Sequence, residues 1–212
     1  MTRERKSPEE RKALLLESAD QLFGQQGYSA TSVMDIANAA GVGKSTFFYY
    51  YANKEEILYA LVSHWGQQVV ADFQGLYDGE NAKTRLIGFI RALAVSYRMP
   101  LLERLFKDQE MALMMGSFDR VLEESFNPVL QGILEQGQEA GNWHLSNMAV
   151  TIHFFWAVVD GLLDAYEEDE ELSVEEGQAR LAVYRQEAEK LLVSLLGLED
   201  GGLSLKLPMF NS

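Results

Sequence analysis

The sequence predicts an all-α fold, and three observations support this prediction. Proline is scarce, with 4 residues in a chain of 212. No runs rich in Val, Ile and Thr alternate with turn signals in the way that sheet proteins require. Apolar residues instead recur at the three- and four-residue spacing of amphipathic helices. The chain is long enough to bury a sizeable core, as one domain or as a small domain joined to a larger one.

The first two predicted helices are marked by their ends. Ser7-Pro8-Glu9-Glu10 is a capping box with proline at the first helical position, and Gly27 supplies a stop for this helix. Thr31 or Ser32 caps a short second helix, whose inward face carries apolar residues.

A tight turn and two further helices follow. Gly41-Val42 makes the turn, because glycine tolerates positive φ there. A third short helix is predicted from about Lys44 to Tyr50. Asn53-Lys54-Glu55-Glu56 then caps a fourth helix, with an apolar stripe that extends to Trp65.

The middle of the chain predicts further amphipathic helices with short breaks. One stripe runs from Leu86 to Tyr97, and Pro100 opens the next helix. A longer helix is predicted from about Ser117 to Ala140, and Pro128 should kink it because proline lacks the N–H of the helical ladder.

The last two predicted helices are the most apolar. The helix capped by Ser146 is apolar nearly all round and must be covered on more than one side. The final helix begins at a Ser173/Glu176 capping box and repeats apolar residues at a seam spacing, so a two-fold partner is expected. The tail 199–212 is predicted to be loose. The predicted dimer interface comprises Ile152, Trp156, Val159, Leu163, Leu181, Tyr184, Ala188, Leu191 and Leu195.

The composition of the chain excludes several classes of protein function. The absence of cysteine excludes disulfides and thiolate chemistry. The longest strongly apolar run, residues 150–163, is interrupted by His153 and Asp160 and is too short to cross a bilayer. The charged N-terminus does not have the pattern of a signal peptide. We therefore expect a cytoplasmic protein without membrane contact, and no motif calls for a metal or another cofactor.

The net charge is unevenly distributed. The chain carries −14 in total, of which residues 1–64 hold −1 and residues 65–212 hold −13. Arg3, Arg5 and Lys6 form part of a basic arm that also includes Arg11 and Lys12. A near-neutral head with a basic arm can approach phosphates, while the acidic remainder discourages non-specific binding.

The stretch Gly43-Lys44-Ser45-Thr46 looks like the end of a phosphate-binding loop. Such a loop needs glycine four residues before the Gly-Lys-Ser, where this chain has Asn38, and it needs a preceding strand, where this chain predicts a helix. Two short helices joined by a glycine turn fit a helix-turn-helix better, with the second helix entering the major groove of DNA.

The segment GYSATSVMDIANAAGVGKSTFFYYYANKEEIL resembles the DNA-binding signature of TetR-type (tetracycline-repressor-like) regulators, and the match covers roughly residues 8 to 62. Three positions depart from the pattern: Gly43 stands where Ser is common, Ser45 where Gly or Ala is frequent, and Phe48 where Tyr is usual. Phe47 takes the position of a buried apolar residue. The resemblance implies DNA contacts by Thr31, Ser32, Met34, Lys44, Ser45, Thr46, Phe48, Tyr49, Tyr50 and Lys54.

Some of these aromatic residues have a simpler interpretation as core. Aromatic stripes usually pack inward, which favours burial of Phe47 and Tyr51, and one of Tyr49 and Tyr50 is expected to be half-buried.

The resemblance also implies the organisation of the whole chain: a helix-turn-helix DNA-binding domain over 1–53, a helical ligand-binding and dimerisation domain over 54–198, and the tail. The expected partners are a double-stranded DNA operator, a second copy of the chain, and a small apolar or amphipathic ligand. Methionines and aromatics suit such a pocket, although ordinary core is the alternative for each residue. The candidates are Phe89, Tyr97, Phe106, Met111, Met114, Met115, Phe118, Phe126 and Phe155.

The expected function is that of a ligand-responsive transcriptional regulator, most simply a repressor. An activator or global regulator of the same fold without a small-molecule inducer is the nearest alternative. A helical enzyme using His153, Asp160 and Asp164 is a rival from another class, and a protein-interaction module whose head has lost DNA binding is a third.

Overall fold

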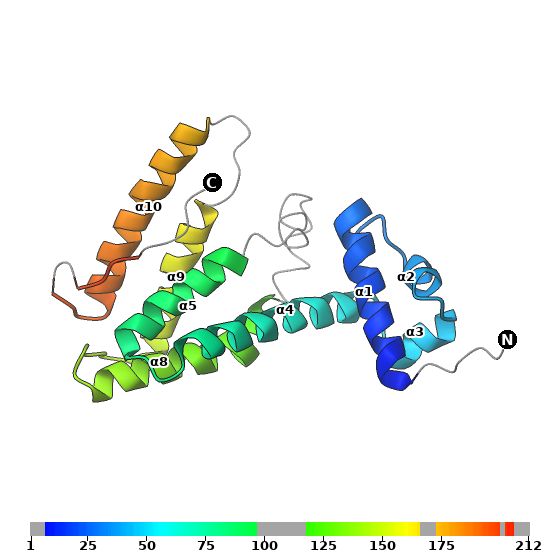
Figure 1. Ribbon diagram of the computed structural model, residues 1–212, viewed down its shortest axis with the longest axis horizontal. Helices are drawn as coiled ribbons and strands as arrows, with labels where there is room; N and C mark the ends of the chain where they lie inside the picture. The colour runs from blue at the N-terminus through cyan, green and yellow to red at the C-terminus, as the bar shows by residue number, and fades with distance from the viewer. Residues whose placement is uncertain (1–6, 97–117, 166–172, 200–201, 206–212) are drawn as a thin grey trace. The chain divides into compact units, whose positions relative to one another are not determined.

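The computed structural model describes residues 7–96, 118–165, 173–199 and 202–205 (Figure 1). The described residues form helices joined by turns and loops, without a strand. Contacts divide the chain into two compact units. Unit 1 is Met1–Gln67 with Arg98–Glu123, and unit 2 is Gln68–Tyr97 with Glu124–Ser212. The division falls inside helix α4, whereas the predicted domain boundary at 53/54 lies at its start.

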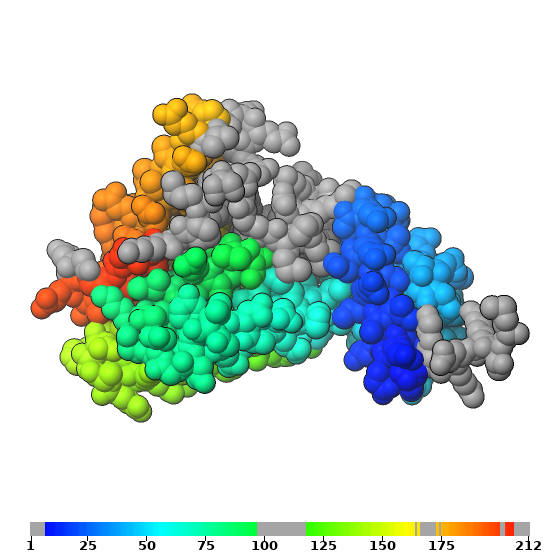
Figure 2. All heavy atoms as spheres, viewed as in Figure 1, coloured from blue at the N-terminus to red at the C-terminus, as the bar shows by residue number. Residues whose placement is uncertain are grey.

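Unit 1 contains α1 (Pro8–Gln26), α2 (Val33–Ala39), α3 (Lys44–Tyr50) and the first part of α4 (Lys54–Tyr77). Figure 2 shows the side chains of α1 in contact with those of α2, in the dark and lighter blue regions. The centre of this unit is largely apolar, and its fully buried residues are Leu15, Ala19, Phe23, Ile36, Ala37, Phe47, Ile57, Val62 and Val121.

The helix ends of unit 1 confirm the predicted caps. Ser7 and Glu10 form a reciprocal capping box, and Gly27 ends α1 with a φ of 86°. Of the two candidates for the second cap, Ser32 is the N-cap of α2 and Thr31 is not. Asn53 accepts a hydrogen bond from the Glu56 backbone N–H at 2.8 Å, at the start of α4.

Unit 2 contains the rest of α4, α5 (Ala82–Ser96), α8 (Asn127–Glu139), α9 (Met148–Asp164) and α10 (Val174–Leu195). Helix α5 packs on α8, α8 on α9, and α9 on α10. An aromatic cluster joins these helices: the Phe89 ring lies 5.4 Å from Phe73, 6.1 Å from Phe126 and 6.1 Å from Trp156. The Trp156 indole also donates a hydrogen bond to Asn127 at 2.7 Å.

The predicted 117–140 helix is confirmed over residues 118–139, which are helical throughout. A π-helical segment, η1 (Leu122–Phe126), directly precedes α8, and Pro128 lies in the first turn of α8. Proline cannot donate to the helical ladder and clashes with the preceding turn, which favours such a local irregularity.

Two predictions about helix ends and the tail need correction. The N-cap of α9 is Asn147, not Ser146, and the Asn147 side chain accepts from the Val150 N–H at 3.1 Å. The tail is not loose throughout, because Leu203 and Leu205 are buried and the Leu205 N–H donates to the Glu189 carboxylate at 2.6 Å. Alternating leucines in an extended segment place both side chains on one face, which the prediction overlooked.

Among the described residues, no helix combines the length and apolarity needed to span a membrane.

Candidate nucleic-acid interface

A glycine turn precedes helix α3 and sets its direction. Gly41 has a φ of 68°, a conformation that other residues adopt only with strain, and the Val42 N–H donates to the Ala37 carbonyl at 2.9 Å. Gly43 is the N-cap of α3 and contributes no side-chain hydrogen bond. The helix therefore lacks the side-chain cap that the serine common at this position could supply.

One face of α3 anchors the helix in unit 1. Phe47 is completely buried and lies 5.8 Å from the ring of Tyr51, which is 4% exposed. The prediction that these two rings belong to the core is confirmed. Tyr50 is half-buried, whereas Tyr49 is 80% exposed, so one of the two tyrosines is half-buried as expected.

The opposite face of α3 is open. At about 100° per residue, Ser45 and Tyr49 project roughly opposite to Phe47. Lys44 and Phe48 flank them on one side, with the Lys44 ammonium 5.8 Å from the centre of the Phe48 ring. Thr46 and Tyr50 flank them on the other side, and both are half-buried. The outward face and its flanks thus carry one cation, four hydroxyl groups and an apolar ring.

These groups have the chemistry of duplex recognition. A lysine ammonium and tyrosine hydroxyls donate to phosphate oxygens, while serine and threonine hydroxyls reach either phosphates or base edges. An apolar ring suits the C5-methyl group of thymine. Helix α3 carries no carboxylate that would repel phosphates.

The start of α2 exposes fewer of the predicted contact residues than expected. Thr31 is 1% exposed, and its hydroxyl donates to the Gly27 carbonyl at 2.7 Å. Its side chain is therefore part of the unit 1 interior, and we remove it from the predicted contact surface. Met34, at 46% exposure, remains on that surface.

Ser32 is exposed but engaged in the α2 cap. Its hydroxyl donates to the Asp35 carboxylate at 2.6 Å, and its backbone N–H donates to the same oxygen at 2.9 Å. The hydrogen bond from the Ser32 hydroxyl, followed by that from its backbone, lowers the pKa of Asp35 below its usual value. A phosphate contact by Ser32 would compete with this box.

Lys54 also has partners within the chain. Its ammonium donates to the Tyr28 carbonyl at 2.7 Å and to the Thr31 carbonyl at 2.8 Å, and it lies 4.0 Å above the Tyr28 ring. The sequence did not predict this role of Tyr28. Tyr28 and Lys54 are 26 positions apart, so nothing in the local pattern indicates that they meet.

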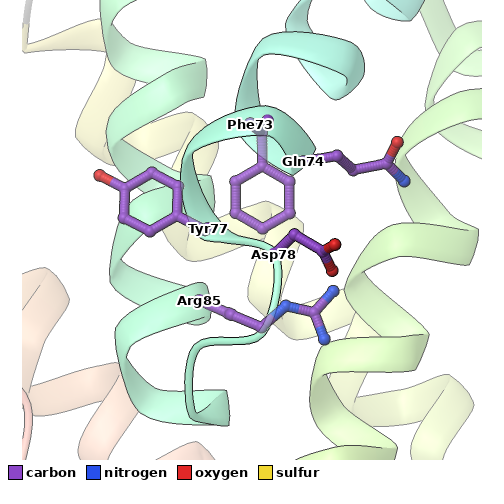
Figure 3. A pocket seen from close by; sticks show the side chains of 6 residues that line it. Phe73, Gln74, Tyr77, Asp78 and Arg85 are labelled. Atoms are coloured by element: carbon purple, nitrogen blue, oxygen red, sulfur yellow. The ribbon is translucent and has the colours of Figure 1, made fainter.

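Unit 2 contains a pocket of about 440 Å³ where α4 ends and α5 begins (Figure 3). Tyr77 stacks on Phe73 with 5.5 Å between ring centres, and Arg85 donates to the Gln136 side chain at 2.8 Å. None of the predicted ligand residues lines it; its lining is Phe73, Gln74, Gly75, Tyr77, Asp78 and Arg85.

The predicted ligand residues separate into groups. Phe89, Phe126 and Phe155 are fully buried and belong to the aromatic cluster around Trp156. Phe118 lies in unit 1, half-buried and stacked 5.9 Å from Trp65. The remaining candidates lie outside the described residues: Tyr97, Phe106, Met111, Met114 and Met115. The ligand pocket stays a prediction.

The predicted interface residues divide by burial. Val159, Leu163, Leu181 and Ala188 are buried within the single chain, so they pack α9 against α10. Ile152, Trp156 and Leu195 are half-buried. Tyr184 and Leu191 remain open, together with three apolar residues that were not predicted; the exposed set is Val150, Phe154, Val183, Tyr184 and Leu191.

The residues of the rival enzyme hypothesis form no recognisable site. His153 and Asp160 are both exposed on α9, and the Asp164 side chain lies outside the described ones. No group of three or more potential metal ligands occurs in the part of the chain that the structure describes.

Unit 1 thus has the fold of a helix-turn-helix DNA-binding domain. Residues 15–61 match the family model of bacterial regulatory proteins, tetR family. The TcmR regulator of Streptomyces glaucescens is 34% identical over 47% of this chain and 44% of its own length. YuxN of Bacillus subtilis, an uncharacterized HTH-type transcriptional regulator, is 36% identical over 26% of this chain and 19% of its own length.

A solved structure of RolR with the ligand resorcinol has the same fold along the chain. Its TM-score is 0.68 at 18% identity, and the match covers 96% of this chain and 98% of RolR. The match to the tetR family of bacterial regulatory proteins thus lies in the N-terminal residues 15–61 of this chain. The chain spans less than half the length of TcmR and YuxN, which are both HTH-type transcriptional regulators.

Proposed function

We propose that the protein is a ligand-responsive transcriptional repressor that binds a pseudo-palindromic operator as a homodimer. The observation that carries this proposal is the outward face of α3. Lys44, Ser45 and Tyr49 are exposed there, while Phe47 anchors the helix from behind. A helix held in this way can enter a major groove with its exposed face while its buried face stays packed in unit 1.

The dimer is supported by the exposed apolar residues of α9 and α10. Val150 and Phe154 lie one turn apart on α9, and both are about half exposed. Tyr184 and Leu191 lie two turns apart on α10. A second copy of the chain would cover these side chains and provide two heads for two half-sites.

Ligand control is supported by the fold shared with RolR, whose solved structure contains resorcinol. We propose that the helical unit of this chain also binds a small apolar or amphipathic molecule. The ligand would favour a head spacing that no longer fits two successive major grooves. Its effect is limited to its differential affinity for the two states.

A gel-shift titration tests the DNA contact. An operator is first selected from a random duplex pool with the wild-type protein, and affinity is measured at physiological salt. Lys44→Ala combined with Tyr49→Phe should weaken binding at least about tenfold, because each removes a donor to phosphate. Lys83→Ala is the matched control, since Lys83 is exposed on α5 of the other unit. Unchanged affinity in the double variant would refute the site.

The same selected duplex separates the alternatives. A regulator should show affinity that falls steeply with salt concentration, whereas an interaction module without DNA binding selects no duplex. Release of the duplex by a member of a metabolite panel would support ligand control, and an activator would raise transcription from a promoter bearing this duplex.

A further inference from the structure

Lys54 is held by two backbone carbonyl oxygens and one aromatic ring. Its ammonium donates to the carbonyls of Tyr28 and Thr31 at 2.7 and 2.8 Å, and the Tyr28 ring covers it at 4.0 Å. Hydrogen bonds with a charged donor are roughly twice as strong as neutral ones, and a cation above an aromatic face adds to them. Three attractive contacts therefore converge on one ammonium group.

The acceptors belong to a rigid turn between α1 and α2. Gly27 starts this turn with positive φ, and the Thr31 hydroxyl closes it by donating to the Gly27 carbonyl. The Thr31 N–H donates to the Tyr28 carbonyl at 3.1 Å, and the Gln26 amide donates to the Thr31 hydroxyl at 3.2 Å. The residue that follows the turn is Ser32, the N-cap of α2.

The position of Lys54 on α4 is unfavourable for the helix itself. Lys54 is the first residue of α4, where the helix dipole is positive and an acidic residue is preferred. Glu55 and Glu56 follow that preference, and Lys54 departs from it. The carbonyl oxygens of the 27–31 turn supply the negative partial charges that make a lysine favourable there.

We infer that Lys54 is a positioning residue that fixes the start of α2, and with it the helix-turn-helix, on the N-terminal end of α4. This inference rests on the proposed DNA-binding function and revises the phosphate contact expected for Lys54. The ammonium sets the orientation in which α3 is presented. It does not itself supply a counter-charge to the duplex.

Salt dependence distinguishes the two roles. Neutralising one phosphate contributes about 0.9 to the slope of log affinity against log salt concentration, so loss of one contact in each subunit of a dimer lowers the slope by about 2. We expect Lys54→Met to bind the selected operator about tenfold more weakly with an unchanged slope. A slope lower by about 2 would overturn the inference. Lys44→Met, which removes an exposed ammonium on α3, is the comparator.

An arginine at position 54 gives a second criterion. Arginine binds phosphate at least as well as lysine does, because its fork matches the oxygens. The planar guanidinium cannot replace a compact ammonium between two carbonyls and a ring. Lys54→Arg should therefore weaken binding as Lys54→Met does. Full affinity in Lys54→Arg would contradict the positioning role.

Amide hydrogen exchange tests, without DNA, whether Lys54 holds the 27–31 turn. In Lys54→Met, exchange of the backbone amides in residues 31–36 should accelerate about tenfold, whereas Lys44→Met should leave it unchanged. Unaltered exchange in Lys54→Met would refute the positioning role of Lys54. If the wild-type protein selects no duplex, the proposed function fails by itself, and the exchange experiment still decides whether Lys54 holds the turn.

Discussion

At the scale of single residues, two glycines of unit 2 are required by the aromatic rings that pack on them. A Cβ at Gly88 would lie 2.6 Å from the ring of Tyr77. A Cβ at Gly137 would overlap the indole of Trp143, which is 1% exposed and donates to the Leu134 carbonyl at 2.9 Å. The Trp143 ring is held in place by its burial and by this hydrogen bond.

The Gly137 contact predicts a large effect of one methyl group. Gly137→Ala should lower the free energy of unfolding by about 1–3 kcal/mol, because it forces the Trp143 ring out of place. Gly132→Ala in the same helix is the matched control, since nothing lies within 4 Å of its Cβ position. It should stabilise the helix by about 0.5–1 kcal/mol. Urea unfolding of both variants checks the pair, and equal effects would contradict the packing.

Tyr51 carries a buried hydroxyl without a hydrogen-bond partner among the described residues. A buried unsatisfied hydroxyl costs about 1–3 kcal/mol, so Tyr51→Phe should raise the stability of unit 1 by roughly 1 kcal/mol. Tyr50→Phe is the control, because the Tyr50 ring on α3 is only half-buried. It should leave the stability of unit 1 unchanged. Thermal unfolding of the two variants measures the difference.

Burial also raises the pKa of the Tyr51 hydroxyl. The folded protein therefore resists this ionisation, and wild-type stability should decline as pH rises past about 10, the ordinary value for tyrosine. Tyr51→Phe should lack this part of the alkaline decline. An identical pH profile for both proteins above pH 10 would show that the hydroxyl is not enclosed.

At the scale of elements, the starts of α1, α2 and α10 were predictable because capping is local. Ser7, Ser32 and Ser173 each form a capping box with the acidic residue three positions later, and this spacing is visible in the sequence. Contacts between distant segments were not predictable. The 27–31 turn receives Lys54 from another helix, and the burial of Thr31 depends on that three-dimensional arrangement.

The interior of unit 2 illustrates the same distinction. Methionine and aromatic content indicates adaptable apolar surface, but it does not separate a cavity wall from a filled core. Phe89 and Phe126 proved to contact each other and Trp156. Their positions on helical stripes were predictable, whereas the rings that they face were fixed only by the packing of α5 on α8 and α8 on α9.

The Asp35 capping box predicts a pH dependence for α2. Hydrogen bonds from the Ser32 hydroxyl and N–H lower the Asp35 pKa from 3.8, so the box stabilises the folded state above the ordinary pKa and is lost as pH falls through the lowered value. Between pH 6 and pH 3, wild type should lose more stability than Asp35→Ala. Denaturant unfolding at the two pH values tests this, and parallel losses would contradict it.

At the scale of the whole molecule, charge is divided between the two parts of the chain. The nearly neutral residues 1–64 include the exposed Lys44, whereas residues 65–212 carry −13 of the total −14. In the proposed DNA complex, phosphates would meet less repulsion from the near-neutral part than from the acidic remainder. This charge distribution is consistent with the proposed binding through α3.

The single chain buries only part of the apolar surface of its last two helices. Leu181 and Ala188 face α9 and are nearly inaccessible, yet Phe154 on α9 and Leu191 on α10 are 53% and 55% exposed. Isolated exposed apolar residues are normal on a monomer. An exposed turn-spaced pair on each of two adjacent helices is instead typical of a surface that a partner covers.

This surface predicts the oligomeric state of two charge variants. Phe154→Glu and Leu191→Glu should each convert the proposed dimer to a monomer at micromolar concentration in sedimentation velocity, because two carboxylates would be buried against their symmetry mates. Leu76→Glu is the matched control, since Leu76 is 75% exposed on α4, away from both helices in the sequence. It should remain dimeric.

Circular dichroism should be unchanged in all three variants, since each side chain is exposed within its own chain. A dimer that survives both substitutions would place the two-fold interface elsewhere, and the requirement for two operator half-sites would then need another pair of surfaces.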